Sequence, residues 1–513
     1  MMASNKSADS VAAVPQDREQ HYHNDFRFQT ARRAGKPCNY GDNTTTTDES
    51  MSRQEALTAL TVDEEKRLLR KVDWRLVPFL CMLYLVKKLD ESNVSNARIM
   101  NKGTERNILT QLDITSNEYN LVTVLYTVPY ILAEIPSNLL IKKFKPSRWQ
   151  SRIMFSWGVV TACTAAVHNT AGLYACRFFL GLTEAGMFPG IILQLSYWYR
   201  PDEIAVRCIW ISYGFHAVSG SGGLSGWQWL FAVEGIATVL LSVFVFLYLP
   251  DFPGNTKWLS PVEKAFLQAR LPQNSPRSSE RDFSGREIVR TFKDKRLWLF
   301  TLSWALMTCK IARIPATEEN HLANPSSDIA TAQILNIPIS ALSIAIILIL
   351  GYSANSARYP LPLYPIGCTV VIVAMYSILV AYPNDIGVYI GMMIGIACGT
   401  AWFPVMWPWR AQTVNGATGS AFAIGFVNSY GQVGDALGPQ MFQEKYQPRN
   451  QVPFGLSMGL IGLCGITCGV LWWITRQTEG DTRKHKLARL EARKTNQAVL
   501  DDVSDRDFDK SRD

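Results

Sequence analysis

Long apolar runs alternate with shorter polar segments along most of the chain. Between Trp74 and Thr475 these runs reach roughly 17–25 residues, the length at which a helix crosses the hydrocarbon core of a bilayer. Charged residues are concentrated outside the runs, so the pattern predicts an all-α membrane protein built from two halves of six helices. The expected parts are a tail with a short amphipathic helix (1–73), a first transmembrane half (74–249), a cytoplasmic central loop (250–296), a second transmembrane half (297–475) and a basic cytoplasmic tail (476–513).

Ten of the twelve spans are clear from length and apolarity. They are Trp74–Ala97, Asn120–Ile141, Trp149–Val167, Ala171–Trp198, Trp227–Leu249, Ile334–Ala354, Leu361–Tyr382, Ile386–Trp407, Ser420–Leu437 and Pro453–Thr475. The other two segments are short. Residues 208–227 hold about eleven apolar residues before a glycine-serine tract, and residues 297–309 form an apolar run of only thirteen. We therefore expect the fifth and seventh helices to be shortened.

One capping box precedes each half. Thr61–Glu64 precedes the first span, and Ser260–Glu263, with a proline at the first helical position, lies in the central loop. Each is followed by basic and then apolar sequence, which suggests an internal duplication. Residues 1–52 are polar and are expected to be disordered.

The first span ends in polar residues. Asp90, Asn93 and Ala97 would share one face of a helix that presents carboxylate and amide groups to a neighbour or a cavity. The alternative is that the span ends near Leu85 and the remainder is a loop.

The fourth run contains two charges in an otherwise apolar helix. Arg177 and Glu184 are seven residues apart, nearly two turns, so they share a face. A charge at mid-membrane costs roughly 2.5–3.5 kcal/mol, and such residues normally face a bundle interior or a water-filled cavity. They are candidates for function; the alternative is an ion pair that only holds two helices together.

Charge also predicts orientation. The net charge of +8 lies mainly in tails and short loops, so it is not a signal for nucleic-acid binding. With twelve spans, most lysine and arginine lies on one side, which the positive-inside rule makes cytoplasmic. If the two short segments failed to cross, the central loop would move outside.

Several further patterns are open to two interpretations. One face of the second span (Tyr130, Glu134, Asn138) and one of the eleventh (Asn428, Gln432, Asp435) would line a cavity or form helix-packing hydrogen bonds. The tryptophans of WFPVMWPWRAQ, residues 402–412, would form a gate over a substrate or an interfacial belt.

Other features argue against an enzyme. The sequence has no apolar signal peptide, no C-x-x-C pair among its ten cysteines, no phosphate-binding loop, no metal-ligand spacing and no nucleophile constellation. We expect no enzymatic activity, no cofactor and no nucleic-acid partner.

Five motifs together resemble the major facilitator superfamily, and more closely its anion:cation symporter branch, the fungal allantoate permease-like transporters. They are LDESNVSNARIMN (89–101), YILAEIPSNLLIKKFKPSRW (130–149), RFFLGLTEAGMFPG (177–190), GWQWLFAVEG (226–235) and YLPDFPGNTKWLSPVE (248–263). The resemblance implies a major facilitator fold and a monomeric plasma-membrane symporter that moves a small organic anion with a proton by alternating access.

The resemblance also implies roles for residues. Proton coupling would fall to Asp90 and Glu184. Substrate binding would involve Arg177, Asn93, Tyr130, Glu134 and Asn428, and a cytoplasmic latch would involve Lys142, Lys143, Lys145 and Arg148. Many relatives have arginine after the first-helix aspartate where this chain has Glu91, which puts the sign of the substrate in doubt. The shortened helices motivate an alternative: a non-transporting nutrient sensor or a defective, truncated transporter.

Overall fold

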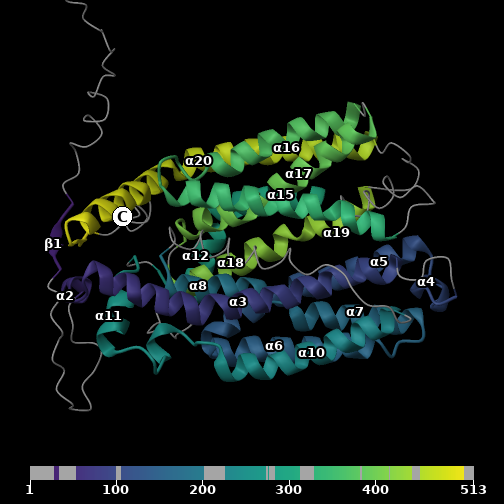
Figure 1. Ribbon diagram of the computed structural model, residues 1–513, viewed down its shortest axis with the longest axis horizontal. Coiled ribbons are helices and arrows are strands. Elements are labelled where there is room, and N and C mark those ends of the chain that lie inside the picture. Colours follow the sequence, from purple (N-terminus) through teal and green to yellow (C-terminus); the bar gives the residue numbers. More distant parts are fainter. Residues whose placement is uncertain are drawn as a thin grey trace, which may run out of the picture.

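The computed structural model describes residues 28–33, 53–99, 105–200, 226–272, 275–276, 284–311, 329–381, 384–414, 416–441 and 451–501. Within these ranges the chain is almost entirely helical, and the helices form two groups that lie side by side with their axes nearly parallel (Figure 1). The first group is α3 (Val62–Ile99), α4 (Ile108–Gln111), α5 (Ser116–Lys143), α6 (Pro146–Thr164), α7 (Thr170–Glu184), α8 (Met187–Trp198) and α10 (Gly226–Tyr248).

The second group follows the central loop in the sequence. It comprises α13 (Lys295–Ile311), α15 (Ile329–Asn355), α16 (Leu363–Ala381), α17 (Asp385–Ala411), α18 (Ala417–Gly431), α19 (Val433–Met441) and α20 (Gln451–Lys494). Shorter elements gather at one end of the bundle: β1 (Thr30–Arg32), α2 (Arg53–Thr58), η1 (Pro253–Asn255), α11 (Pro261–Ala269), α12 (Gly285–Lys293) and β2 (Gln497–Val499). Both predicted capping boxes are present, at Thr61–Glu64 and at Ser260–Glu263.

Seven stretches of described helix are long and apolar enough to cross a membrane. They are Leu121–Lys143, Thr170–Trp198, Trp227–Tyr248, Pro338–Asn355, Leu363–Ala381, Ile386–Ala411 and Gln451–Lys494. Their outward faces are apolar, as at Leu240 and Ile466, which are 67% and 65% exposed. The prediction of a multi-pass helical membrane protein is confirmed.

The two short spans have different outcomes. The predicted fifth helix lies mostly outside the described residues, in 201–225. The seventh is α13, which has 17 residues and ends at Ile311 in the described chain. At 1.5 Å per residue its length is about 25 Å, less than the roughly 30 Å of a bilayer core.

Three helices differ from the expected outline. α3 is continuous to Ile99, so the alternative of a loop after Leu85 is wrong. The fourth run is divided at Gly186 into α7 and α8, and the eleventh at Gln432 into α18 and α19. Gly186 adopts a left-handed backbone (φ 89°), and a Cβ there would lie 2.2 Å from the Ser137 hydroxyl. Glycine therefore allows α5 to pack against the break.

The halves meet through few elements. α18 packs against α5 and α8, and α19 packs against α5. In Figure 1 α8 and α18 accordingly lie between the two groups. These contacts place the faces predicted on the second and eleventh spans against one another.

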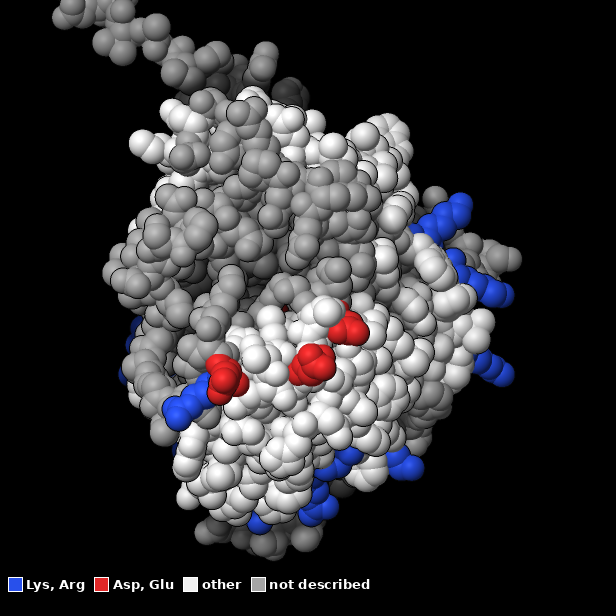
Figure 2. Space-filling view, turned by 90° about the vertical axis from the view of Figure 1, so that its right-hand side faces the viewer, with Lys and Arg blue, Asp and Glu red and all other residues white. Residues whose placement is uncertain are grey.

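The two ends of the bundle differ in charge. Figure 2 shows the end that carries α4, where acidic side chains face the viewer. Glu105, Asp113 and Glu118 are exposed in the described chain around α4. The opposite end carries exposed Lys143, Lys145 and Arg148, among other basic residues. The positive-inside rule predicts that the basic end faces the cytoplasm. The orientation itself stays a prediction.

The chain termini are joined in what we name the terminal clasp: β1, β2, the start of α3 and the end of α20. β1 and β2 pair antiparallel, with Ala31 opposite Ala498. The expectation of disorder throughout residues 1–52 is therefore wrong at β1. A sequence pattern could not indicate this pairing, because the partner strand lies more than 450 residues away.

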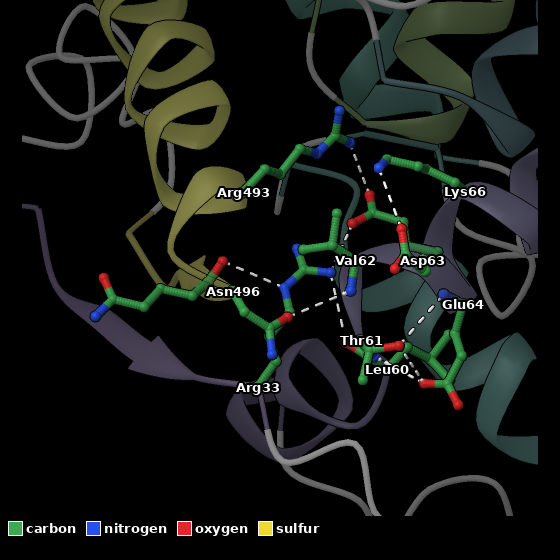
Figure 3. Close-up of polar contacts among 11 residues, drawn as sticks. Arg33, Leu60, Thr61, Val62, Asp63, Glu64, Lys66, Arg493 and Asn496 are labelled. Carbon is green, nitrogen blue, oxygen red and sulfur yellow. Dashed lines mark hydrogen bonds and ion pairs between the residues drawn. The ribbon is translucent and has the colours of Figure 1, made fainter.

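The clasp is centred on Glu65. Figure 3 shows Arg33, Arg493 and Asn496 beside the start of α3. The Glu65 carboxylate accepts a 2.7 Å bond from Arg33 and a 2.8 Å bond from Arg493, so it connects the strand, the first helix and the last helix. The Asn496 side chain also accepts from the Val62 amide at 3.4 Å. Glu65 is only 2% exposed.

The charge of Glu65 is stabilised by its neighbours. Burial alone would raise its pKa, but the arginines Arg270, Arg493, Arg200 and Arg33 together lower the pKa from 4.5 to about 2. A carboxyl whose pKa is lower in the folded state stabilises the fold above its unfolded pKa and loses that contribution as the pH falls toward the folded value. The shift corresponds to about 3 kcal/mol at neutral pH.

We expect Glu65→Gln to lower the thermal midpoint of the detergent-solubilised protein by several degrees at pH 7, because the arginines lose their counter-charge. The difference from the wild type should hold from pH 8 to pH 5 and shrink below about pH 4.5. Asp63→Asn is the matched control, since Asp63 pairs with Lys66 on the exposed surface two residues away. Equal midpoints for Glu65→Gln and Asp63→Asn would show that the clasp adds no stability.

Candidate functional site

Five ionisable side chains gather inside the first half, in what we name the amino-terminal charge cluster. α3 contributes Lys87 and Asp90, α7 contributes Arg177 and Glu184, and α10 contributes Glu234. Lys87, Asp90, Arg177 and Glu184 are between 2% and 7% exposed, and the two carboxylate oxygens of Glu234 are fully buried. Three of the five, Asp90, Arg177 and Glu184, are residues that the sequence indicated.

Asp90 is held by α6. Its carboxylate accepts a hydrogen bond from the Trp157 indole at 3.0 Å and from the Thr161 hydroxyl at 3.4 Å. Asn93, one turn further along α3, is also buried at 5% exposure. The predicted polar face of the first span therefore points into the half.

Glu184 pairs with a residue that the sequence did not assign to the site. Lys87 lies 3.3 Å from its carboxylate, and the Tyr126 hydroxyl donates to it at 2.8 Å. Arg177, although on the same face of α7, does not form an ion pair with Glu184; its guanidinium lies 5.1 Å from the centroid of the Phe231 ring. Arg177 and Glu184 thus do not pair with one another, but the Lys87–Glu184 ion pair links α3 to α7, as the alternative of an ion pair that holds two helices together requires.

The Arg177 side chain keeps hydrogen-bonding capacity. Its Nε is buried and has no hydrogen-bond partner. On the neighbouring helix, Glu91 is neutralised locally, because Lys88 lies 2.6 Å and Lys87 3.9 Å from its carboxylate. The two lysines therefore compensate the negative charge of Glu91, so that Arg177 does not face an uncompensated carboxylate there.

Gly181 sets the distance between α7 and α5. It lies one turn from both Arg177 and Glu184, and a Cβ at this position would be 2.1 Å from the Tyr126 carbonyl oxygen. The close approach brings Tyr126 to Glu184. Gly190 is also close to a neighbour, because a Cβ there would lie 2.5 Å from the amide at the end of the Gln150 side chain.

A second polar group forms the seam between the halves, which we define as the contact of Tyr130, Glu134, Asn138 and Lys142 on α5 with α18. All four α5 residues are buried, and they are spaced one turn apart. Glu134 accepts from the Ser429 hydroxyl at 2.7 Å, from the Asn428 amide and from Tyr130 at 3.4 Å.

The seam continues toward the basic end. Asn138 donates to the Ala421 carbonyl, and Lys142 donates to the Thr418 hydroxyl at 2.7 Å. Gly425 permits this contact, because a Cβ there would lie 3.4 Å from the Asn138 Cβ. Of the predicted latch residues, Lys142 thus bridges the halves, whereas Lys143, Lys145 and Arg148 are exposed. The side chain of Asp435 lies outside the described residues.

The central loop contacts the same end of α18. Glu287 of α12 accepts a 2.9 Å bond from the Gly419 amide, and the Ser284 amide donates to Thr418 at 3.3 Å. A carboxylate at a helix N-terminus compensates unpaired amides and the helix dipole. The loop therefore secures α18 where Lys142 also binds.

The tryptophans of the tenth span lie inside the second half. Trp402 and Trp407 are at most 2% exposed, and Trp304 of α13 lies 4.7 Å from Trp407 between ring centroids. Phe188 of the first half approaches Trp407 at 5.9 Å. Their burial excludes an interfacial belt for these two residues. Of these aromatic side chains, Trp407 borders a pocket that also touches Arg410, Ser420 and Ile424.

Sequence reasoning missed two residues of the cluster, Lys87 and Glu234, and the more unusual of them is Glu234. Both of its carboxylate oxygens are buried without a hydrogen-bond partner. The signal was available, because Glu234 is the single charged residue between Trp227 and Leu249. No group of residues suited to a metal ion occurs in the described part of the chain.

Comparison with known proteins agrees with this architecture. The family model described as Major Facilitator Superfamily matches residues 103–439. The MFS transporter prlL of a fungal species is 29% identical over 310 residues, which cover 58% of this chain and 63% of that protein. A putative tartrate transporter of Agrobacterium vitis is 29% identical over 405 residues, covering 74% of this chain and 86% of that protein.

A solved structure shows the same fold. The crystal structure of the human organic anion transporter MFSD10 (TETRAN) superposes with a TM-score of 0.57 at 13% identity, covering 77% of this chain and 99% of that one. The two helical groups and the seven apolar stretches thus define a multi-pass helical membrane protein. The chain belongs to the Major Facilitator Superfamily, a family of transporters and not a class of enzymes.

We expect Gly181→Val to separate α7 from α5, because its side chain would overlap the Tyr126 carbonyl. Overpacking of this kind costs about 1–3 kcal/mol or more. The thermal midpoint in detergent should fall, and the yield of monodisperse protein with it. Gly462→Val is the control, because nothing lies within 4 Å of a Cβ at Gly462. If both variants had equal midpoints, the close approach at Gly181 would not constrain the site.

Proposed function

We propose that the protein is a proton-coupled symporter of a small organic anion and that it works by alternating access. The observation that supports this most directly is the amino-terminal charge cluster, where a buried arginine lies among buried carboxylates inside a transporter fold. Buried ionisable residues of this kind mark substrate and proton pathways in membrane proteins.

Arg177 is the proposed anion-binding residue. A guanidinium offers a planar fork of donors that fits a carboxylate with two hydrogen bonds. The unpartnered Nε and the position over Phe231 leave such donors available. Similarity to a putative tartrate transporter supports a small carboxylate as the substrate class. Compensation of Glu91 by two lysines removes the objection that its charge would repel an anion.

Asp90 and Glu184 are the proposed proton-coupling residues. In the proposed cycle, a proton on Asp90 would free Trp157 and Thr161 to rearrange. A proton on Glu184 would free Lys87 and Tyr126 in the same way. The change in charge would link proton loading to the affinity of Arg177 for the anion. Further substrate contacts are proposed for Asn93, Tyr130, Glu134 and Asn428.

Alternating access requires the halves to rock around the site. The seam on α5 would open on one side, and Lys142, Lys143, Lys145 and Arg148 would act as the cytoplasmic latch. We further propose that the protein belongs to the anion:cation symporter branch, resembles allantoate permeases in substrate class, and acts as a monomer in the plasma membrane.

A second function is favoured by one observation. The described part of α13, 17 residues that end at Ile311, is shorter than a bilayer core requires. A half with a shortened helix would suit a non-transporting nutrient sensor or a defective transporter. Binding of the anion without uptake would support this alternative.

We expect uptake of radiolabelled tartrate or allantoate into proteoliposomes, driven by an inward proton gradient, to fall roughly ten- to hundredfold in Arg177→Ala. This loss corresponds to about 1.5–3 kcal/mol for hydrogen bonds to a charged group. Arg177→Lys should restore only part of the affinity, because lysine lacks the fork. Glu184→Gln should abolish the dependence on the gradient.

The control for this experiment is Lys66→Ala, since the Lys66 side chain is 60% exposed on the surface of α3. Full uptake in both Arg177→Ala and Glu184→Gln would refute the site. Gradient-independent binding to the wild type with no uptake at all would instead favour the sensor.

A further inference from the structure

Glu234 is placed in the charge cluster by a close crossing of α6 and α10. Gly158 and Gly235 lie at the crossing: a Cβ on Gly235 would be 2.4 Å from the Ala162 amide, and one on Gly158 would be 3.0 Å from the Gly235 carbonyl. The residues beside Gly158 include Trp157, which donates to Asp90. The neighbour of Gly235 is Glu234. Glu234 thus lies beside this crossing, and Asp90 is the first of the charged groups that act on it.

The face of α10 supports the same placement. Phe231 and Glu234 are three residues apart, so they lie on one face of the helix. Phe231 lies under the Arg177 guanidinium at 5.1 Å. The charged groups that act on Glu234 are Asp90 from α3 and Arg177 and Glu184 from α7. The α6 groups at this crossing, Trp157 and Thr161, are neutral.

The charges of the cluster do not balance. Lys87 and Arg177 are cations, whereas Asp90, Glu184 and Glu234 are acids; Lys88 and Glu91 compensate one another beside them. With every group ionised the cluster would be negative by one. A net charge inside a low-dielectric bundle is costly, and an acid there takes up a proton before it stays charged without partners. The cluster is therefore neutral when one of its three acids carries a proton.

The three acids differ in what they would lose on protonation. Asp90 accepts from Trp157 and Thr161, and Glu184 accepts from Tyr126 and pairs with Lys87. Glu234 has neither a hydrogen bond nor an ion pair, and its oxygens are sealed from water. A proton on Glu234 therefore breaks no contact, whereas a proton on either other acid does.

We propose that Glu234 is the residue that holds the proton of the resting cluster, with Asp90 and Glu184 remaining ionised beside Arg177 and Lys87. The inference rests on the proposed proton coupling and adds a third carboxyl to it. When an anion binds at Arg177, the cluster gains a negative charge, which favours uptake of a further proton by Asp90 or Glu184, the proposed coupling residues; release of the anion releases that proton. One proton then accompanies one carboxylate.

Infrared spectroscopy of the purified full-length protein in detergent tests this without any substrate. A protonated carboxyl gives a C=O stretching band that shifts in D₂O and is distinct from the bands of ionised carboxylates. We expect the wild-type spectrum minus the Glu234→Gln spectrum to contain such a band at pH 7; other buried acids, such as Glu134, contribute to both spectra and cancel. Glu234→Asp, which restores a carboxyl at the same place, should regain it.

Asp90→Asn and Glu184→Gln are the matched controls, because each removes a buried acid of the same cluster. Both should retain the band. Persistence of the band in Glu234→Gln, or its loss in Asp90→Asn or Glu184→Gln alone, would overturn the assignment. The result is independent of the anion: failure of tartrate and allantoate uptake would count against the proposed function and leave the proton assignment standing.

Discussion

An ionised side chain inside a membrane-spanning bundle keeps its charge only where protein groups replace water, and this requirement organises the interior of the molecule. In the first half, Lys87 lies between Glu184 and Glu91, and α6 supplies two neutral donors to Asp90. Tight helix contacts at Gly181, Gly158 and Gly235 bring these donors and charges within range. The apolar outer faces and the polar interior are thus two consequences of one solvation cost.

Much of the fold follows from patterns that the sequence displays locally. Apolar run length identifies seven of the predicted spans among the described helices, and both capping boxes form as predicted. Arg177 and Glu184 share a buried face, as their spacing requires, and the faces of Asp90 and Glu134 are buried as well. The spacing of residues along the chain does not determine which side chains bind one another. Glu184 binds Lys87 from another helix, and Glu134 binds Asn428 from the other half.

Features that depend on distant segments could not be predicted in the same way. The division of the fourth span at Gly186 arises because Ser137 of α5 occupies the space of a side chain. The burial of Trp402 and Trp407 depends on packing against Trp304 of α13. Glu234 differs from these, since a single acid in an apolar run was visible, but its lack of partners emerges only from the packing of α6 against α10.

The terminal clasp has a consequence for the time course of biosynthesis. Glu65 and Arg493 are separated by 428 residues, and β2 follows Arg493. At about 5–20 residues per second, a ribosome needs on the order of tens of seconds to add that stretch. The first half therefore enters the bilayer with the Glu65 contacts incomplete, and only the last part of the chain to emerge supplies the missing arginine and strand. A chain that stops short of residue 493 leaves a buried carboxylate without one of its cations.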